Sequence, residues 1–256
     1  MRSRPGWVIA LREVRLLRQD PLPLVLLLAV PVVFIAFLKP VMFVTLVIEG
    51  FPGRNGSEQA VPGAAATFSL LLCGLVGLSF FREHGWGTWD RLRASPATTG
   101  QILVGKLVPV YAFAVVQTAW LFGVGVVAFD LDVRGSMRAL GAVGLAAAAA
   151  HVAIGLVLVA FSRTIQQVNA LANLGTALLA GAGGALVPRF LLPGWVEAVG
   201  PWTPTYWAMR GYRAVILDGA GWSAVARPVA TLLAFAVGAS VVALMRFSVD
   251  ERKAQL

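Results

Sequence analysis

Charged residues are scarce in this chain. They make up 13% of its 256 residues, whereas hydrophobic residues make up 58%. An ordinary soluble domain is roughly a quarter charged and under half apolar, so a soluble globular protein is disfavoured. The formal net charge of +9 would suit nucleic acid. The basic residues are spread over several segments instead of forming one stripe, however, and no binding to nucleic acid is expected.

Residues that usually carry catalysis or bind metals are also few. The single cysteine, Cys73, excludes an internal disulfide and a cysteine metal cluster. The two histidines, His84 and His151, lie in different segments, and no His-Glu-x-x-His or Gly-x-Ser-x-Gly motif is present. These absences disfavour an intramembrane enzyme. A secondary carrier is the other alternative, and it would usually show charged residues in mid-membrane.

Long apolar runs dominate what is present. A transmembrane helix needs roughly 20 apolar residues, whereas barrel strands alternate over about ten. We therefore predict an all-α integral membrane fold, a six-transmembrane-helix bundle over residues 22–245, within a single domain that covers 1–256. The six uncharged runs are Leu22–Leu38 (with an optional extension to Ile48), Gly63–Phe81, Leu107–Phe129, Ala139–Ser162, Val168–Val187 and Val229–Met245.

The positions of Lys and Arg predict the orientation. Five arginines precede the first run, and only Lys39 and Arg54 separate it from the second. Because basic residues favour the cytoplasmic side, both termini, including the tail 246–256, are expected in the cytoplasm of a plasma (inner) membrane protein. We expect the N-terminus to be retained, since it lacks a signal-peptide cleavage site. The outer segments would then be 39–62, 130–138 and 188–228.

The first 21 residues are predicted to hold a helix over Trp7–Gln19 that ends at Asp20-Pro21. This helix would lie along the cytoplasmic membrane surface, although an ordinary basic anchor remains an alternative. Its apolar side would comprise Trp7, Ala10, Leu11, Val14 and Leu17, and its interfacial residues would include Trp7, Arg12, Arg15 and Arg18.

A short capped helix is predicted between the second and third runs. Thr88 would be its N-cap, Asp90 favours its start, and Pro96 prevents its continuation. Thr98 and Gln101 then fit a capping box, which predicts that a new helix starts there and enters the third run.

Three groups of residues carry a resemblance to a known family. They are Arg18-Gln19-Asp20-Pro21, the segment Arg82-Glu83-x-Gly85-x-Gly87-Thr88-x-x-x-Leu92-x-x-Ser95-Pro96 with the later Gly105-Lys106, and Pro193-Gly194-Trp195…Pro201-x-x-Pro204-x-x-x-x-x-Arg210. With them the chain resembles the type-2 ABC export permeases, which include the daunorubicin-resistance permeases. The family has an acidic residue directly before its first glycine. Here His84 stands at that position after Glu83, so either residue could fill the acidic role.

The resemblance implies a permease subunit of an ABC exporter for an amphipathic drug, lipid or glycolipid-type substrate. It implies two copies of a separate ATPase subunit that hold ATP and Mg, no cofactor or nucleotide site in this chain, and a homodimer or a heterodimer with a sister permease among membrane lipids. The residues that would couple to the ATPase are Glu83, Gly87, Thr88, Trp89, Asp90, Arg91, Arg93 and Pro96.

Two motif matches are interpreted as coincidences. Gly100–Lys106 covers most of a phosphate-binding P-loop, but Leu107 stands where the magnesium ligand should be, and a membrane run follows. Glu197-Ala198 matches only the start of the cytoplasmic loop of ABC importer permeases, and it falls on the predicted outer side.

A few polar side chains lie within the apolar runs, namely Gln117, His151, Asn169 and Asn173. Each could line a pathway or contact a neighbouring helix. Helix contact is favoured for the two asparagines, and a structural hydrogen bond is favoured for His151.

The segment 188–228 is rich in aromatic residues and proline. It is predicted to form one or two re-entrant or interfacial helices, with a simple aromatic belt as an equal alternative. The resemblance suggests an outer gate region at Pro201, Pro204, Tyr206 and Arg210.

Overall fold

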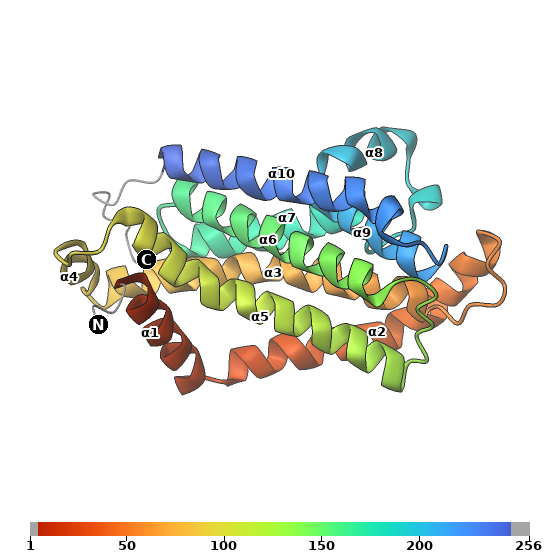
Figure 1. Cartoon of the computed structure of the whole chain (residues 1–256), viewed down its shortest axis with the longest axis horizontal. Coiled ribbons are helices and arrows are strands. Elements are labelled where there is room, and N and C mark those ends of the chain that lie inside the picture. Colours follow the sequence, from red (N-terminus) through yellow and green to blue (C-terminus); the bar gives the residue numbers. More distant parts are fainter. Residues whose placement is uncertain (1–4, 247–256) are drawn as a thin grey trace.

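The structure, a computed structural model, describes residues 5–246, and every regular element in that range is a helix (Figure 1). Residues 1–4 and most of the predicted tail 246–256 lie outside the described range. The all-α prediction is therefore confirmed. The elements are α1 (Pro5–Gln19), α2 (Leu22–Ile48), α3 (Ser57–Gly85), α4 (Trp89–Arg93), α5 (Thr99–Ala128), α6 (Met137–Phe161), α7 (Ile165–Ala182), η1 (Arg189–Leu191), α8 (Gly194–Val199), η2 (Gly200–Trp202), α9 (Pro204–Ile216) and α10 (Trp222–Arg246).

Five of the described helices, α2, α3, α5, α6 and α10, are long and apolar enough to cross a membrane. The helix predicted from the fifth run also forms as α7, which packs on α3. Its 18 residues include four side-chain amides, at Gln166, Gln167, Asn169 and Asn173, so it is less apolar than the other five. The chain is thus a multi-pass membrane protein, and the sixth span stays a prediction.

The buried helix α3 forms the centre of the bundle and contacts α2, α5, α6, α7 and α9. Small residues allow this close packing. A Cβ atom added at Gly63 would lie 2.3 Å from the backbone oxygen of Ala185, and one at Gly77 would lie 2.5 Å from a methyl group of Val168. Glycine therefore lets α3 approach the α7 segment more closely than any other residue would.

Two predicted segment boundaries are wrong. The helix α2 continues through Lys39 to Ile48, which confirms the optional extension of the first run, and the Lys39 ammonium donates to the backbone oxygen of Phe129 at 2.9 Å. The connection to α3 is thus residues 49–56, not 39–62. Likewise α10 begins at Trp222, well before the predicted Val229, so the segment 188–228 is also shorter than expected.

The bundle has two distinct ends. The helices α1 and α4 lie together at one end, on the left of Figure 1, whereas α8 and α9 lie at the other. We refer to these as the α4 end and the α9 end. The chain enters α2 and leaves α10 at the α4 end, and the cytoplasmic position of both termini stays a prediction.

Candidate functional site

Five charged side chains meet where α1, α3 and α5 converge at the α4 end. We call Arg12, Glu13, Arg82, Glu83 and Lys106 the charge cluster. Three of its members are nearly inaccessible to solvent, since Glu83 and Lys106 are 0% exposed and Glu13 is 2% exposed. Burial of so many charges costs several kcal/mol per ion unless each ion is paired, so the arrangement depends on its internal contacts.

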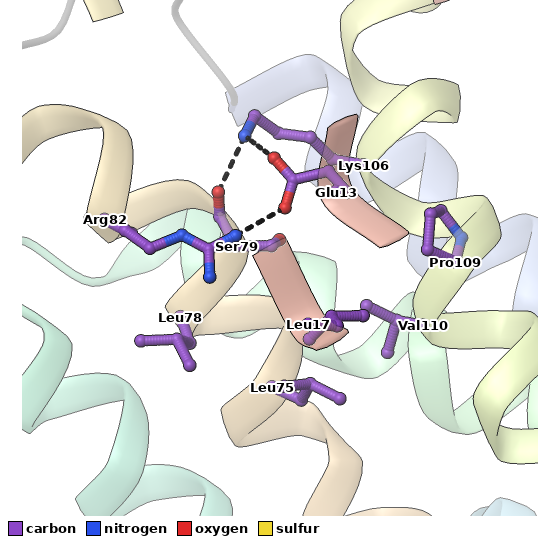
Figure 2. Close-up of a pocket in the computed structure, with 9 residues that line it drawn as sticks. All are labelled: Glu13, Leu17, Leu75, Leu78, Ser79, Arg82, Lys106, Pro109 and Val110. Carbon is purple, nitrogen blue, oxygen red and sulfur yellow. Dashed lines mark hydrogen bonds and ion pairs between the residues drawn. The ribbon is translucent and has the colours of Figure 1, made fainter. Parts of the chain in front are cut away.

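Lys106 is the central cation of the charge cluster (Figure 2). Its Nζ lies 2.8 Å from Oε1 of Glu13 and 3.5 Å from Oε1 of Glu83, and it donates to the backbone oxygen of Ser79 at 2.7 Å. The ammonium also lies 5.6 Å from the centre of the Phe80 ring. One side chain of α5 thereby holds α1 and α3 together.

Two arginines complete the charge cluster. Nη2 of Arg82 lies 2.8 Å from Oε2 of Glu13, and Nη1 of Arg12 lies 2.7 Å from Oε1 of Glu83. Each carboxylate is therefore shared between Lys106 and one arginine, and the pairs cross between α1 and α3. As a consequence, α1 cannot shift relative to α3 or α5 without breaking charge-assisted bonds.

Gly6 in α1 and Gly105 in α5 face each other and allow the two helices to approach closely enough for these bonds. A Cβ added at Gly105 would lie 2.7 Å from the backbone oxygen of Gly6 and 2.8 Å from Cβ of Ile9. The pair Gly105-Lys106 thus serves packing and charge pairing. Residues 100–106 lie within α5, so they form no phosphate-binding loop.

The chain turns from α3 into α4 at Gly87, whose φ is +63°. In this left-handed conformation an L residue is strained, which explains a glycine here. The prediction that Thr88 caps α4 is wrong. Thr88 holds the N-cap position but has helical backbone angles and makes no capping bond, and its hydroxyl instead hydrogen-bonds to the carboxylate of Glu83, a stronger acceptor.

Trp89 attaches α4 to the end of α3. It is 3% exposed and stacks on His84, with ring centres 4.5 Å apart. Trp89 therefore faces the bundle, contrary to the prediction that it belongs to a docking surface, whereas Asp90 and Arg91 are exposed. His84 contacts this ring, so Glu83 is the residue that makes the acidic contacts.

The remaining predicted residues of this end also have defined places. Arg93 is the last residue of α4, and Pro96 is exposed in the turn that follows. The capping box is confirmed, because Thr98 accepts from the Gln101 amide at 3.3 Å and Gln101 accepts from the Thr98 amide at 3.0 Å. It starts α5 as expected.

The predicted apolar side of α1 is only partly packed against the bundle, and its position along the membrane surface stays a prediction. Ala10 and Glu13 are buried, whereas Trp7 is 62% exposed and Leu11 is also exposed, because the helix turns its acidic residue toward Lys106. Arg12, Arg15 and Arg18 are exposed to different degrees on the outside of the helix. Sequence reasoning missed Glu13, although a single acidic residue among arginines was an available signal.

Gln117 makes the predicted helix contact. Its side-chain amide donates to the backbone oxygen of Leu27 in α2 at 2.7 Å. That oxygen lacks a helical donor because Pro31, four residues later, has no N–H. Gln117 thus satisfies an acceptor freed by proline and joins α5 to α2.

His151 is the expected structural histidine. It is fully buried, and its Nδ1 lies 3.0 Å from the hydroxyl oxygen of Ser69. The two asparagines differ from expectation. Asn169 and Asn173 are exposed and make no hydrogen bond to another described residue, so the favoured hydrogen bond to a neighbouring helix is not made within this chain, although Asn169 lies against α3 at Gly74.

At the α9 end the segment after α7 forms the two α-helices α8 and α9, and their predicted re-entrant or interfacial position stays a prediction. The aromatic-belt interpretation is wrong for α9, since Tyr206 and Trp207 are buried in the bundle. Pro204 lies in the first turn of α9, and the Trp207 ring nitrogen donates to the backbone oxygen of Pro201 at 2.8 Å. Arg210 is exposed.

A cavity of about 800 Å³ opens beside α9. Its wall combines the ends of α2 and α3 with the segment after α7 and with α9. The polar lining side chains include Glu49, Gln59, Arg189, Glu197, Arg210, Arg213 and Asp218.

Several membrane-length helices surround the buried helix α3, which defines a polytopic membrane protein. At one end of the bundle, the charge cluster joins α1 and α4 to these spans. Residues 45–245 match the family described as ABC-2 family transporter protein. The chain therefore belongs to this family of ABC transporter permeases, and the resemblance found in the sequence is confirmed.

Two known proteins are similar to this chain. The chain is 29% identical over 168 residues to a probable multidrug ABC transporter permease, YbhR, of Escherichia coli (strain K12), which covers 59% of this chain and 43% of YbhR. It is 26% identical over 193 residues to the linearmycin resistance permease protein LnrN of Bacillus subtilis (strain 168), which covers 72% of this chain and 48% of LnrN. The chain thus matches less than half the length of either relative. No solved structure matches it.

Proposed function

We propose that this chain is the permease subunit of an ABC exporter that moves amphipathic drugs, lipids or glycolipid-type molecules out of the cytoplasm or the inner leaflet. The family membership and the multidrug and linearmycin-resistance names of its relatives support this proposal. The observation that carries it is the charge cluster, which joins α1 and α4 to the membrane helices at one end of the bundle.

In this proposal two copies of a separate ATPase subunit bind ATP and Mg²⁺ and press on α4 from the cytoplasm. Asp90 and Arg91 are exposed there, next to Arg93 and Pro96, whereas Trp89 transmits the force through His84. Thr88 and Glu83 then connect α4 to α3, and Arg12 connects α3 to α1. The α4 end and both termini therefore face the cytoplasm of the plasma (inner) membrane.

The polar face of α7 supports a dimer. Gln166, Asn169 and Asn173 are exposed within one chain, yet polar groups in membrane spans usually face protein or a water-filled route. A second copy of this chain or a sister permease would cover this face, with α7 as the sixth span. Substrate would pass next to it and leave past the outer gate region at Pro201, Pro204, Tyr206 and Arg210.

Co-purification from native membranes tests the coupling surface. The tagged chain should bring down an ATPase with complete nucleotide motifs, and alanine at both Asp90 and Arg91 should remove it. Trp89 is not substituted, because it is buried and its replacement would also destabilise the fold. Arg138→Ala, which removes an exposed arginine at the other end of the bundle, is the matched control. A chain that purifies alone in every form would exclude the ATPase-driven function.

Cysteine cross-linking tests the dimer. Cys73 is buried and is the one native cysteine, so Cys73→Ala provides a background for Asn173→Cys. A cross-linked dimer in native membranes is the expected result. Val237→Cys, on the exposed surface of α10, should stay monomeric. Equal cross-linking of both variants would argue against an α7 interface.

A further inference from the structure

Three arginines gather on two neighbouring aromatic rings at the α9 end. The rings of Tyr206 and Trp207 meet edge to face, with centres 5.3 Å apart. The guanidinium carbons of Arg210 and Arg227 lie 5.5 Å and 5.4 Å from the centre of the Trp207 ring, and that of Arg189 lies 4.7 Å from the centre of the Tyr206 ring. Such contacts hold a cation in place and leave its N–H edges available to other acceptors.

The Trp207 ring is a fixed support. It is buried, and its nitrogen donates to Pro201, so the ring cannot turn away. Arg210 comes from α9 and Arg227 from α10, and both residues are exposed. Both guanidinium carbons lie near the same ring centre, so the distance between them cannot exceed the sum of their distances to that centre. We call Arg210 and Arg227 the arginine pair.

The arginine pair has no carboxylate within ion-pair distance among residues 5–246. The neighbouring Arg189 reaches Glu197 only at 3.9 Å, and both of these side chains are almost half exposed. Two like charges near one ring repel each other, and that repulsion favours binding of an anion close to them.

The acidic residues that line the neighbouring cavity do not fully neutralise the positive charge of these arginines. Glu49 and Arg213 neutralise each other at 2.5 Å. If Asp218 on the cavity wall and Glu197 are counted against the three arginines, one positive charge remains.

We propose that the arginine pair binds the phosphate of an anionic phospholipid at the membrane surface on the α9 end. Arg227 lies near the start of α10, one of the membrane-length helices, five residues after the exposed Trp222. Tryptophan at a helix end is typical of the membrane–water interface, and the planar guanidinium suits phosphate oxygens. Beyond Arg227 along α10, Leu233 and Val237 are exposed and supply an apolar surface for an acyl chain. A lipid therefore fits better than a free anion.

Native mass spectrometry of the full-length chain in mild detergent with phosphatidylglycerol tests this. The wild type should retain the lipid, and R210Q/R227Q should retain it at least about a hundredfold less, because two charge-assisted bonds are lost and each contributes about tenfold or more. R138Q, an exposed arginine at the same end that contacts no described ring, should match the wild type. R210K/R227K should fall between them, since lysine keeps the charge but loses the planar fork.

Unchanged retention by R210Q/R227Q would overturn the proposal. Complete displacement by millimolar inorganic phosphate would overturn the assignment to a lipid, and equal retention of phosphatidylcholine would overturn the anionic preference. If the double variant aggregates on size exclusion, W207F replaces it. That variant keeps both charges but loses the bond to Pro201, so a severalfold lower retention is expected and an unchanged one refutes the role of the ring. No transport is measured, so the result does not depend on the proposed function.

Discussion

Replacement of Lys106 with methionine removes the cation that Glu13 and Glu83 share. Both carboxylates are buried, and each would keep one arginine, at 2.8 Å for Glu13 and 2.7 Å for Glu83. Removal of one partner from a buried ion pair costs about 3–5 kcal/mol, and the remaining arginines place the expected loss near the lower value, about 3 kcal/mol. For a chain of this size, that loss corresponds to a fall of about 6–12 °C in the unfolding midpoint.

Thermal unfolding in mild detergent, followed by size exclusion, measures this midpoint. Lys39→Met is the matched control, because Lys39 donates to a backbone oxygen of Phe129 and its loss leaves no buried charge. Its cost should stay near that of one ordinary hydrogen bond, about 1 kcal/mol. The double variant Glu13→Gln/Lys106→Met should be more stable than the two single effects predict, with a coupling of about 0.5–3 kcal/mol. A fall for Lys106→Met no larger than for Lys39→Met, or strict additivity, would refute the central role of Lys106.

Three further variants test single contacts by the same thermal assay. Gly105→Leu should destabilise by about 1–3 kcal/mol and expose α1 to protease, because its Cβ alone would reach a backbone oxygen of α1; an unchanged digestion pattern would contradict this. Gly87→Ala should cost about 1–2 kcal/mol at its positive φ, whereas Gly123→Ala, inside α5 with open space around its Cβ, should cost nothing, since alanine favours a helix more than glycine does. Gln117→Leu should cost about 1–3 kcal/mol, since it leaves the oxygen of Leu27 without a donor; equal stability would argue against this satisfaction of the acceptor.

Most local signals were read correctly from the sequence, and the cap at Thr88 is the exception, because its hydroxyl bonds to Glu83 instead. The Thr98–Gln101 capping box and the stop at Asp20-Pro21 depend only on residues within one helical turn, so propensity and capping rules apply directly. The apolar runs predicted the long helices for a similar reason, since a span must satisfy all its backbone groups internally.

Long-range contacts were not predictable by the same rules. Glu13 and Lys106 are 93 residues apart in sequence, and neither residue has a local pattern that identifies the other. Hydrophobicity does not mark which side of α1 packs on the bundle, because lipid is as apolar as leucine and Trp7 and Leu11 can lie outside. Aromatic residues are equally ambiguous, because Tyr206 and Trp207 would suit an interface as well as a core.

The helix α3 carries anchoring contacts at both of its ends. Glu83 belongs to the charge cluster, and Gln59, near the other terminus, donates to the oxygen of Gly184 at 3.0 Å and accepts from Arg213 at 2.6 Å. With 29 residues, α3 is about 43 Å long at 1.5 Å per residue. If it turns as one rod about its α4 end, a tilt of about 5° displaces its far end by about 4 Å, more than the length of a hydrogen bond. The weak point of this rod is Pro62, which leaves the oxygen of Glu58 without its helical donor, so bending would concentrate one turn from the cavity.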